Sequence, residues 1–327
     1  MTVSAGSRVD EFELIHRHLT SLGAGRKDVL LGPGDDAALV QPPPGQQLAM
    51  TMDTLLAGRH FPHDLPAEAV GHRALAANLS DLAAMGAEPA WALLGLALPD
   101  ADEGWLAGFV RGLGDLARRF GVAVVGGDLV QGPLGVSIQL TGFAPAGGAL
   151  RRDRARPGDD IWVSGALGGA MAALEHGLAA LEQTDPGLYA RFAAPEPRVD
   201  LGSRLVGIAT SAIDVSDGLA ADLLHILNAS GTGAAVFSES VPVDSGAATY
   251  FPASRALEFA LAGGDDYELC FTAPPGRADA VREAAAGCGL EVSRIGQCVS
   301  GAGLEITRGD QVLELGSVGW NHFGAGP

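Results

Sequence analysis

The sequence predicts an α+β protein of two domains: an N-terminal α/β domain with a mixed sheet and a C-terminal α+β domain. The chain has 327 residues with a hydrophobic share of 47%, enough for two cores of ordinary size. Predicted strands abut one another, which favours a mixed sheet over a doubly wound parallel one. Glycine, arginine and proline accumulate over 146–158, and we therefore place the domains at 1–148 and 149–327.

Three helices are predicted in the first half of the chain. Apolar residues recur every three or four positions over 10–22 and Gly23 follows them, which predicts the first helix. Pro66 opens a second helix that extends to residue 85. Asp102 caps a third helix, which reaches residue 120.

Strands lie between these helices. Short apolar runs predict them at 48–56, 91–98, 122–125 and 134–144. The first of these strands is expected to end near Asp53. The strand at 122–125 is expected to run into a turn formed by Gly126, Gly127 and Asp128.

The second half begins with a strand at 160–164, and the glycine-rich turn at 165–169 opens an apolar helix. That turn could approach a phosphate or could permit close helix packing. The polar, proline-containing segment 182–197 predicts an irregular excursion between helices. Further helices are expected at 201–209, 219–228, 256–261 and 277–286, and further strands at 234–237, 267–272, 292–295, 304–307 and 311–315.

Charge and cysteine content limit the partners and the location. The chain has 21 basic and 39 acidic residues, a formal charge of -18, so we expect neither nucleic acid nor an anionic membrane as a partner. Cys270, Cys288 and Cys298 show no C-x-x-C spacing, which predicts neither a disulfide framework nor a zinc site. The first ten residues contain no apolar core and no long apolar run occurs, so a cytoplasmic protein is expected.

Aspartates beside glycine or at predicted strand ends recur along the chain. They stand at 34–36, 52–53, 127–128, 214–218 and 263–266. If folding gathers these carboxylates, cations must neutralise them, and an all-oxygen site favours Mg²⁺ or Ca²⁺. Lys27 is the one lysine of the sequence and lies in no Walker-type phosphate loop. A bound phosphate would therefore depend on Mg²⁺, arginine and backbone amides.

Seven motifs, taken in order, resemble those of the thiamine-monophosphate kinase family. This family belongs to an ATP-binding superfamily that includes aminoimidazole ribonucleotide synthetase and selenophosphate synthetase. The motifs are GDDAA at 34–38, DTLLAGRHF at 53–61, NLSDLAAMGA at 78–87, GGD at 126–128, RPGD at 156–159, IDVSDGL at 213–219 and GGDDYEL at 263–269. Any one of them is weak, but together they span nearly the whole chain and are highly specific.

The resemblance implies transfer of the γ-phosphoryl group of ATP to thiamine monophosphate with several Mg²⁺ ions. It also implies a homodimer formed by the N-terminal domain, and a C-terminal domain that closes over the nucleotide. Ser216 has no histidine or lysine base beside it, so no catalytic nucleophile is expected. The implied residues are Asp36, Thr51, Met52, Asp53, Asp81, Asp128, Asp214 and Asp217 for Mg²⁺; Gly127, Asp128, Arg152 and Ser216 for ATP; and His60, Asp265 and Trp320 for the substrate.

Two positions depart from the family pattern. Met52 stands where the family commonly has threonine, and its thioether is a poor Mg²⁺ ligand. Either its backbone carbonyl alone serves there or one metal shell is altered. Asp265 stands where the family often has glutamate and is one methylene shorter.

Several alternatives stay open at this point. Asp35 and Asp266 could orient turns through hydrogen bonds instead of touching metal, Asp81 could simply be solvated, and Trp320 could be a packing anchor. The chain could also be another ATP-dependent synthetase of the superfamily, although selenophosphate synthetase needs an N-terminal cysteine and none precedes Cys270. A metal-dependent phosphohydrolase and an inactive nucleotide-binding regulator are the remaining functional classes.

Overall fold

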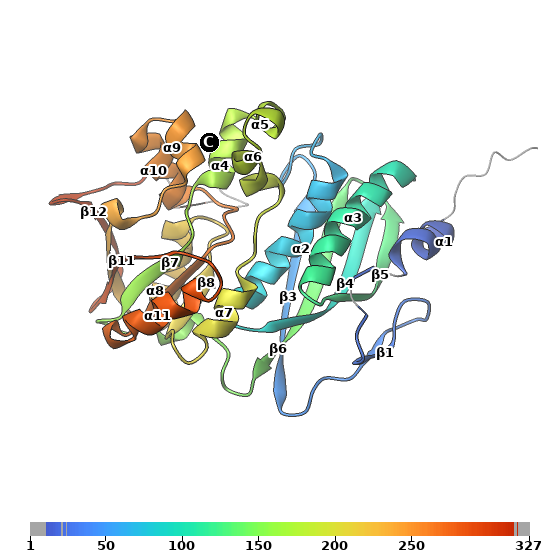
Figure 1. Cartoon of the computed structure of the whole chain (residues 1–327), viewed down its shortest axis with the longest axis horizontal. Helices are drawn as coiled ribbons and strands as arrows, with labels where there is room; N and C mark the ends of the chain where they lie inside the picture. The colour runs from blue at the N-terminus through green and yellow to red at the C-terminus, as the bar shows by residue number, and fades with distance from the viewer. Residues whose placement is uncertain (1–10, 21, 24, 317–318, 320–327) are drawn as a thin grey trace, which may run out of the picture. The chain divides into compact units, whose positions relative to one another are not determined.

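The computed structural model describes residues 11–20, 22–23, 25–316 and 319, and the chain divides into two compact units (Figure 1). The first unit comprises Met1–Asn78 and Pro89–Phe143, and the second comprises Leu79–Glu88 and Ala144–Pro327. Each unit combines a sheet with helices, so the predicted α+β class is confirmed. The domain limits of 1–148 and 149–327 stay a proposal.

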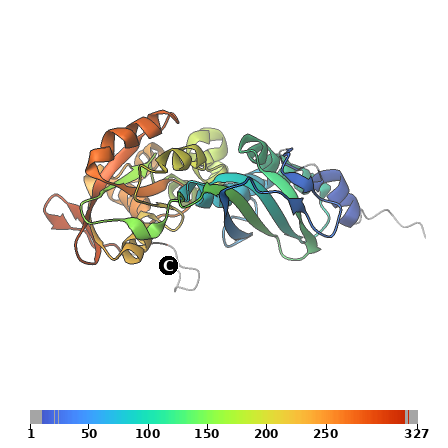
Figure 2. The same cartoon turned by 90° about the horizontal axis from the view of Figure 1, so that it is seen from below.

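The first unit is built on a four-stranded sheet of order β3-β6-β4-β5, in which β4 and β5 run parallel. Helices α2 and α3 lie on one face of this sheet (Figures 1 and 2). A separate antiparallel pair, β1 and β2, precedes it. The bounds are α1 Glu11–Leu14, the π-helical turn η1 Ile15–Leu19, β1 Val29–Leu31, β2 Leu39–Val40, β3 Gln46–Leu56, α2 Ala67–Ala84, β4 Glu88–Leu98, α3 Glu103–Arg119, β5 Ala123–Gln131 and β6 Gly135–Pro145.

Helices α2 and α3 pack so closely that side chains are excluded at their contact. A Cβ atom on Gly71 would lie 2.1 Å from the carbonyl oxygen of Phe109, and one on Gly112 would lie 1.9 Å from that of Glu68. Only glycine fits at either position. Asp102 caps α3 as predicted, because its carboxylate accepts a hydrogen bond from the backbone N–H of Trp105 at 3.0 Å.

Three predictions in this unit need correction. The first helix ends at Leu19, because Leu22 instead accepts a hydrogen bond from the N–H of Val124 and Gly23 bridges to Ala123. Strand β3 ends at Leu56, as the predicted range 48–56 has it, and not near Asp53. Strand β5 continues through 126–128 to Gln131, because these residues pair with β4 and do not form a turn.

The second unit contains a seven-stranded mixed sheet of order β13-β12-β9-β11-β7-β10-β8, antiparallel except between β12 and β9. Helix α8 packs on the core of this sheet through Leu223, Ile226 and Leu227. The bounds are β7 Asp160–Ser164, α4 Gly169–His176, α5 Leu178–Thr184, α6 Pro186–Ala193, α7 Val199–Leu205, β8 Ser211–Asp214, α8 Leu219–Ser230, β9 Gly233–Phe237, α9 Ser245–Tyr250, α10 Ala253–Ala262, β10 Leu269–Ala273, α11 Ala278–Ala286, β11 Val292–Val299, β12 Gly303–Arg308 and β13 Gln311–Val312.

The predicted excursion at 182–197 is wrong, since α5 and α6 occupy most of it. Asp185 caps α6 by accepting from the N–H of Leu188 at 3.0 Å, and Pro186 occupies the first helical turn, so an Asp-Pro pair that suggested a loop in fact starts a helix. The helix expected at 201–209 begins earlier and ends at Leu205. The last strand ends at Val312 and not at 315. Strands β1, β2 and β8 and helix α9 were not predicted.

The end of α2 belongs to the second unit because it packs on α7. A Cβ atom on Gly202 would lie 2.0 Å from the carbonyl oxygen of Ala83, and one on Gly86 would lie 2.6 Å from the side chain of Val206. This contact carries Ser80 and Asp81 into the second unit. Within the residues that the structure describes, we find no helix with the length and apolar character needed to cross a membrane.

Candidate functional site

Strand β3 presents two different faces. Thr51 and Asp53 lie on the same face as the buried Leu55, whereas Met52 lies on the opposite face and is 64% exposed. Because side chains alternate along a strand, the Met52 thioether points away from the carboxylate of Asp53. The Met52 thioether therefore does not lie on the Asp53 face, and the two alternatives, a ligand role for the Met52 backbone carbonyl alone or an altered metal shell, both stay open.

Asp53 and Asp128 lie on opposite edges of the four-stranded sheet, on β3 and β5. One copy of the sheet therefore does not bring these two carboxylates onto neighbouring strands. Asp128 is exposed and pairs with Gly95 of β4. Gly127 is needed for that pairing, since a Cβ atom there would lie 1.9 Å from the carbonyl oxygen of Leu94.

Asp36 and His60 lie on tight turns of the first unit. The carboxylate of Asp35 accepts a hydrogen bond from the N–H of Asp36 at 2.8 Å, so Asp35 shapes the turn and the exposed Asp36 is presented by it. The Nδ1 atom of His60 accepts from the N–H of Leu56 at 3.0 Å. In the neutral ring this bond places the proton on Nε2.

Two carboxylates come together in the second unit, at the end of β8. The hydroxyl of Ser80 donates to Oδ2 of Asp214 at 2.8 Å, and Asp81 follows Ser80 on α2. Burial and, next, the negative charge of Asp81 raise the pKa of Asp214 to about 8. The charge of Arg152 acts in the opposite direction. Asp81 is half-buried beside Asp214, and its role as a metal ligand stays a prediction.

The loop after Asp214 is held by a residue that the sequence analysis did not identify. Asp222, in the first turn of α8, is 2% exposed. Its Oδ2 atom accepts the backbone N–H groups of Ser216, Asp217 and Gly218 at 2.9, 3.0 and 3.1 Å. Burial and then the charge of Asp217 raise the pKa of Asp222 to about 7. One signal in the sequence could have identified Asp222: it is a polar residue four positions after an Asp-Gly pair, at the start of a predicted helix.

The loop at 263–268 lies directly against the loop at 215–218. The N–H of Asp265 donates to the carbonyl of Ser216 and the N–H of Tyr267 to that of Val215, both at 2.9 Å. A Cβ atom on Gly264 would lie 2.3 Å from the carbonyl oxygen of Ser216, which explains the glycine. The fold therefore brings the predicted residues Ser216, Asp217 and Asp265 onto one pair of loops.

Asp266 is turned away from this surface and occupies the N-terminus of α4. It is 3% exposed and accepts the N–H of Gly168 at 2.7 Å and that of Ala170 at 3.4 Å. The glycine-rich turn therefore already holds a carboxylate of the protein in place of a phosphate. Close packing also explains this turn, since a Cβ atom on Gly168 would lie 2.7 Å from the N atom of Ala260.

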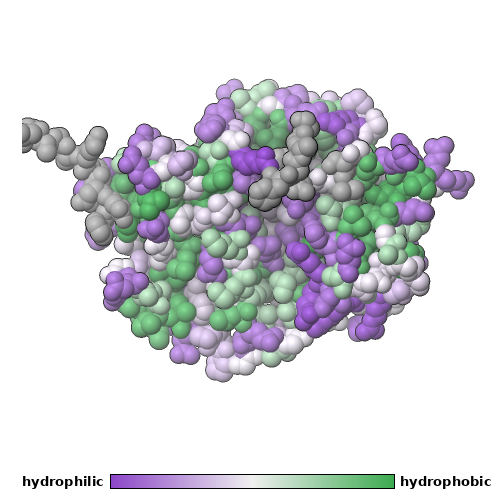
Figure 3. Space-filling view, turned by 180° about the vertical axis from the view of Figure 1, so that it is seen from behind, coloured by the Kyte–Doolittle hydropathy of each residue, from purple (hydrophilic) through white to green (hydrophobic). Residues whose placement is uncertain are grey.

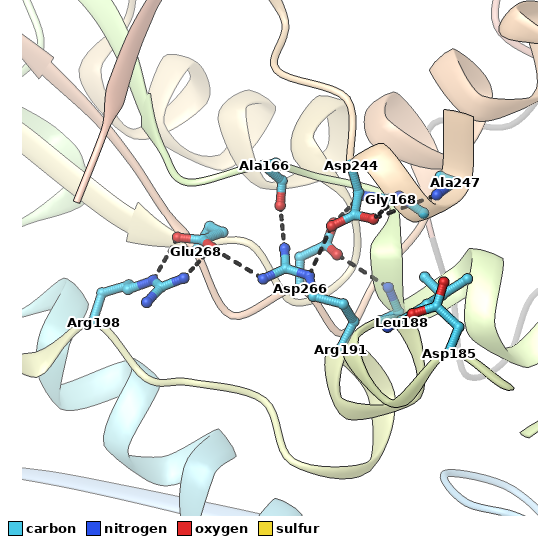
Figure 4. Close-up of polar contacts among 12 residues, drawn as sticks. Ala166, Gly168, Asp185, Leu188, Arg191, Arg198, Asp244, Ala247, Asp266 and Glu268 are labelled. Carbon is cyan, nitrogen blue, oxygen red and sulfur yellow. Dashed lines mark hydrogen bonds and ion pairs between the residues drawn. The ribbon is translucent and has the colours of Figure 1, made fainter. Parts of the chain in front are cut away.

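Glu268 lies in a buried ion-pair network beside Asp266 (Figure 4). The Glu268 side chain is 0% exposed and accepts from Nε of Arg198 at 2.7 Å and from the Ser164 hydroxyl at 2.6 Å. Arg191 turns toward the same carboxylate at 3.6 Å and pairs with Asp244 at 3.2 Å. The 263–268 loop is thus anchored from inside by two acidic residues. A turn-orienting role was one of the alternatives left open for Asp266, whereas the role of Glu268 was not predicted.

Trp320 lies outside the described residues, and its role at the substrate stays a prediction. Its neighbour Gly319 is described and lies against the 215–218 loop. A Cβ atom on Gly319 would be 2.7 Å from the carbonyl oxygen of Asp217 and 2.6 Å from the Cβ of Ala221.

The donor set of the second unit suits a hard divalent cation. The Asp81 and Asp214 side chains offer only oxygen ligands. Burial and the charge of Asp81 disfavour the charged form of Asp214, and a bound cation would favour that form again. Among the described side chains, no group of three or more His, Cys, Asp or Glu is arranged to hold a metal by itself. Mg²⁺ is commonly held by one or two carboxylates and completes its shell with water and substrate phosphates.

Comparison with known proteins identifies relatives along nearly the whole chain. Residues 34–144 and 156–309 match the family models described as AIR synthase related protein, N-terminal domain and C-terminal domain. The thiamine-monophosphate kinase of Salmonella typhimurium is 42% identical over 318 residues, which cover 96% of this chain and 98% of that protein.

Solved structures agree with this assignment. The crystal structure of the thiamine-monophosphate kinase from Stenotrophomonas maltophilia is 47% identical, with a TM-score of 0.83, and the match covers 86% of this chain and 92% of that one. The structure of AaThiL complexed with AMPPCP and TMP is 31% identical, with a TM-score of 0.75, over 86% of this chain and 89% of that one.

Proposed function

The chain belongs to the thiamine-monophosphate kinase family, and from this premise we propose that it transfers the γ-phosphoryl group of ATP in line to thiamine monophosphate, with several Mg²⁺ ions bound. The observation that supports this most is the pairing of Asp81 with Asp214 beside the loops that present Ser216, Asp217 and Asp265. The complex of the relative AaThiL with AMPPCP and TMP supports the same pair of ligands here.

Both reactants of this transfer are phosphates, so they repel each other. Mg²⁺ bound by Asp81, Asp214 and Asp217, and by Asp36, Asp53 and Asp128 of the first unit, would neutralise donor and acceptor charge. Lys27 is the one lysine of the sequence, so any cationic side chain at the phosphates would be an arginine. The charge of Arg152 acts at Asp214, and we assign Arg152 to the nucleotide phosphates.

The chain's own residues position the reactants. We assign Ser216 and Gly127 to ATP, and His60, Asp265 and Trp320 to thiamine monophosphate. The His60 proton on Nε2 and the Asp265 carboxylate would supply one donor and one acceptor to the substrate. Thiamine carries a flat aminopyrimidine and a cationic thiazolium, for which an indole such as that of Trp320 is suited. No side chain acts as a nucleophile in this scheme.

The metal assignment is tested by replacing Asp214 with asparagine, which keeps the shape of the side chain and removes its charge. We expect the variant to need a much higher Mg²⁺ concentration for half-maximal thiamine diphosphate formation. Asp279→Asn, on the exposed surface of α11, is the matched control and should behave as the native chain. An unchanged Mg²⁺ requirement in Asp214→Asn would remove Asp214 from the metal site.

The uncovered face of the first sheet supports a homodimer. Leu48, Met50, Met52 and Leu56 of β3 are 44–67% exposed, and Leu93 of β4 is 43% exposed. This is the face opposite α2 and α3, and hydrophobic residues gather on it in Figure 3. We propose that a second copy covers it. Sedimentation should give a dimer, and Met50→Glu should shift it to monomer, whereas a native chain that sediments as monomer at all concentrations would exclude the dimer.

Two further expectations stay proposals. A cytoplasmic location fits the three cysteines without disulfides, all of which are free in the structure. A phosphohydrolase is less well supported than a kinase, because the relatives that cover nearly the whole chain are kinases by name.

A further inference from the structure

Asp265 and Tyr267 have an unusual backbone conformation. Their φ angles are +66° and +51°, and within the described part of the chain they are the residues other than glycine with positive φ. A residue with a Cβ atom is sterically disfavoured in this region, and such strain persists only where the surroundings impose it.

Hydrogen bonds on two sides of the loop impose the positive φ angles of Asp265 and Tyr267. On the buried side, Asp266 is bound by backbone N–H groups of the α4 turn, and Glu268 is bound by Arg198 and Ser164 (Figure 4). On the other side, the N–H groups of Asp265 and Tyr267 are bonded to the carbonyls of Ser216 and Val215. The backbone between 265 and 268 therefore has almost no freedom.

The strained backbone brings two side chains together. The hydroxyl of Tyr267 donates to Oδ1 of Asp265 at 3.0 Å. Tyr267 is buried, with 5% of its surface exposed, whereas Asp265 is only half-buried. A rigid, buried phenol thus holds a carboxylate that faces the outside of the loop.

We propose that Tyr267 is a positioning residue that fixes the carboxylate of Asp265 for binding of the substrate, and so sets the affinity for thiamine monophosphate. The proposal rests on the proposed function of Asp265 as a substrate contact. Aspartate is one methylene shorter than glutamate, so its reach depends on one rotamer being held. A carboxylate ordered before binding loses less conformational freedom on binding, which strengthens the complex.

The test is a double-mutant cycle with Tyr267→Phe and Asp265→Gly. Phenylalanine keeps the ring and removes the hydroxyl, and glycine removes the carboxylate while accepting the positive φ without strain. The readouts are the KM values for thiamine monophosphate and ATP, kcat, and the equilibrium Kd of thiamine monophosphate in the presence of a non-hydrolysable ATP analogue. Tyr250→Phe is the matched control, because the Tyr250 hydroxyl also bonds an aspartate, Asp185, in the same unit.

We expect Tyr267→Phe to raise the KM and Kd for thiamine monophosphate roughly 3- to 10-fold, the effect of losing one hydrogen bond to a half-buried charged group. The kcat value and the KM for ATP should be nearly unchanged. The control should change neither constant. In the Asp265→Gly background, Tyr267→Phe should have no further effect on either constant.

Three outcomes would overturn the proposal, and they differ from one another. If Asp265→Gly weakens substrate binding and Tyr267→Phe does not, Tyr267 has no positioning role although Asp265 keeps its own. If Tyr267→Phe has the same effect in both backgrounds, it acts through another residue. If Asp265→Gly leaves the Kd unchanged, Asp265 is no substrate contact, which refutes that part of the proposed function together with the role of Tyr267.

Discussion

Replacing Arg198 by methionine should destabilise the second unit by up to about 3 to 5 kcal/mol, the range for removing the main partner of a buried charge. The magnitude follows from the surroundings of Glu268, which is 0% exposed. Arg198 bonds both carboxylate oxygens of Glu268. Without Arg198, the side-chain partners of Glu268 among the described residues would be the Ser164 hydroxyl at 2.6 Å and Arg191 at 3.6 Å. Methionine fills much of the same volume, so the loss is mainly electrostatic.

The assay is denaturant unfolding followed by circular dichroism, with Arg255→Met as the matched control. Arg255 also pairs with two glutamates, Glu175 and Glu258, but its side chain is 41% exposed. Its replacement should cost less than about 1 kcal/mol, because water screens exposed pairs.

A second variant separates charge from packing. Arg198→Met combined with Glu268→Gln removes both charges, and we expect it to be less destabilised than Arg198→Met alone. The reasoning is refuted if Arg198→Met costs no more than the control, or if the double variant is less stable than the single one.

Three further predictions concern the metal, the reaction and pH. Asp53→Asn should keep the fold, checked by circular dichroism, and sharply lower turnover; near-normal turnover at saturating Mg²⁺ would show that Asp53 is no ligand. Mixing the chain with γ-labelled ATP alone should leave no label on the protein, and recovery of a phosphoprotein would exclude direct transfer. Burial raises the pKa of Asp266 to about 7 from 3.8, so the stability it contributes is present below about pH 4 and lost as pH rises through 7. Asp266→Asn should therefore gain stability relative to the native chain over that range, by up to about 4 kcal/mol in urea titrations; a pH-independent difference would contradict this.

Most helices and strands could be predicted because short stretches of sequence indicate where they begin and end. Strand β7 and the helix that opens at Gly169 follow directly from apolar runs and glycine, and Asp102 caps α3 as its position suggests. Strand β8 was missed because its four residues are too short to show a period. The continuation of β5 through Gly127 was missed because glycine there meets a tertiary need, close approach to Leu94, that resembles a turn signal in the sequence.

The site could be predicted in its exposed residues more than in its buried ones. The acidic motifs predicted Asp214, Asp217 and Asp265 as site residues, and the second unit brings the loops that carry them together. The roles of Asp222 and Glu268 were not predicted, because a buried carboxylate that holds a loop leaves no local pattern in the sequence. Their partners, three backbone N–H groups for one and an arginine 70 residues away for the other, are set by tertiary structure.

The most direct test of the proposed function follows the label of γ-labelled ATP when the chain is incubated with thiamine monophosphate and Mg²⁺. We predict that the label appears in thiamine diphosphate in an amount equal to the ADP formed, and that Asp214→Asn strongly reduces both. Release of the label as inorganic phosphate, with no labelled thiamine diphosphate, would contradict the proposed function and indicate a phosphohydrolase.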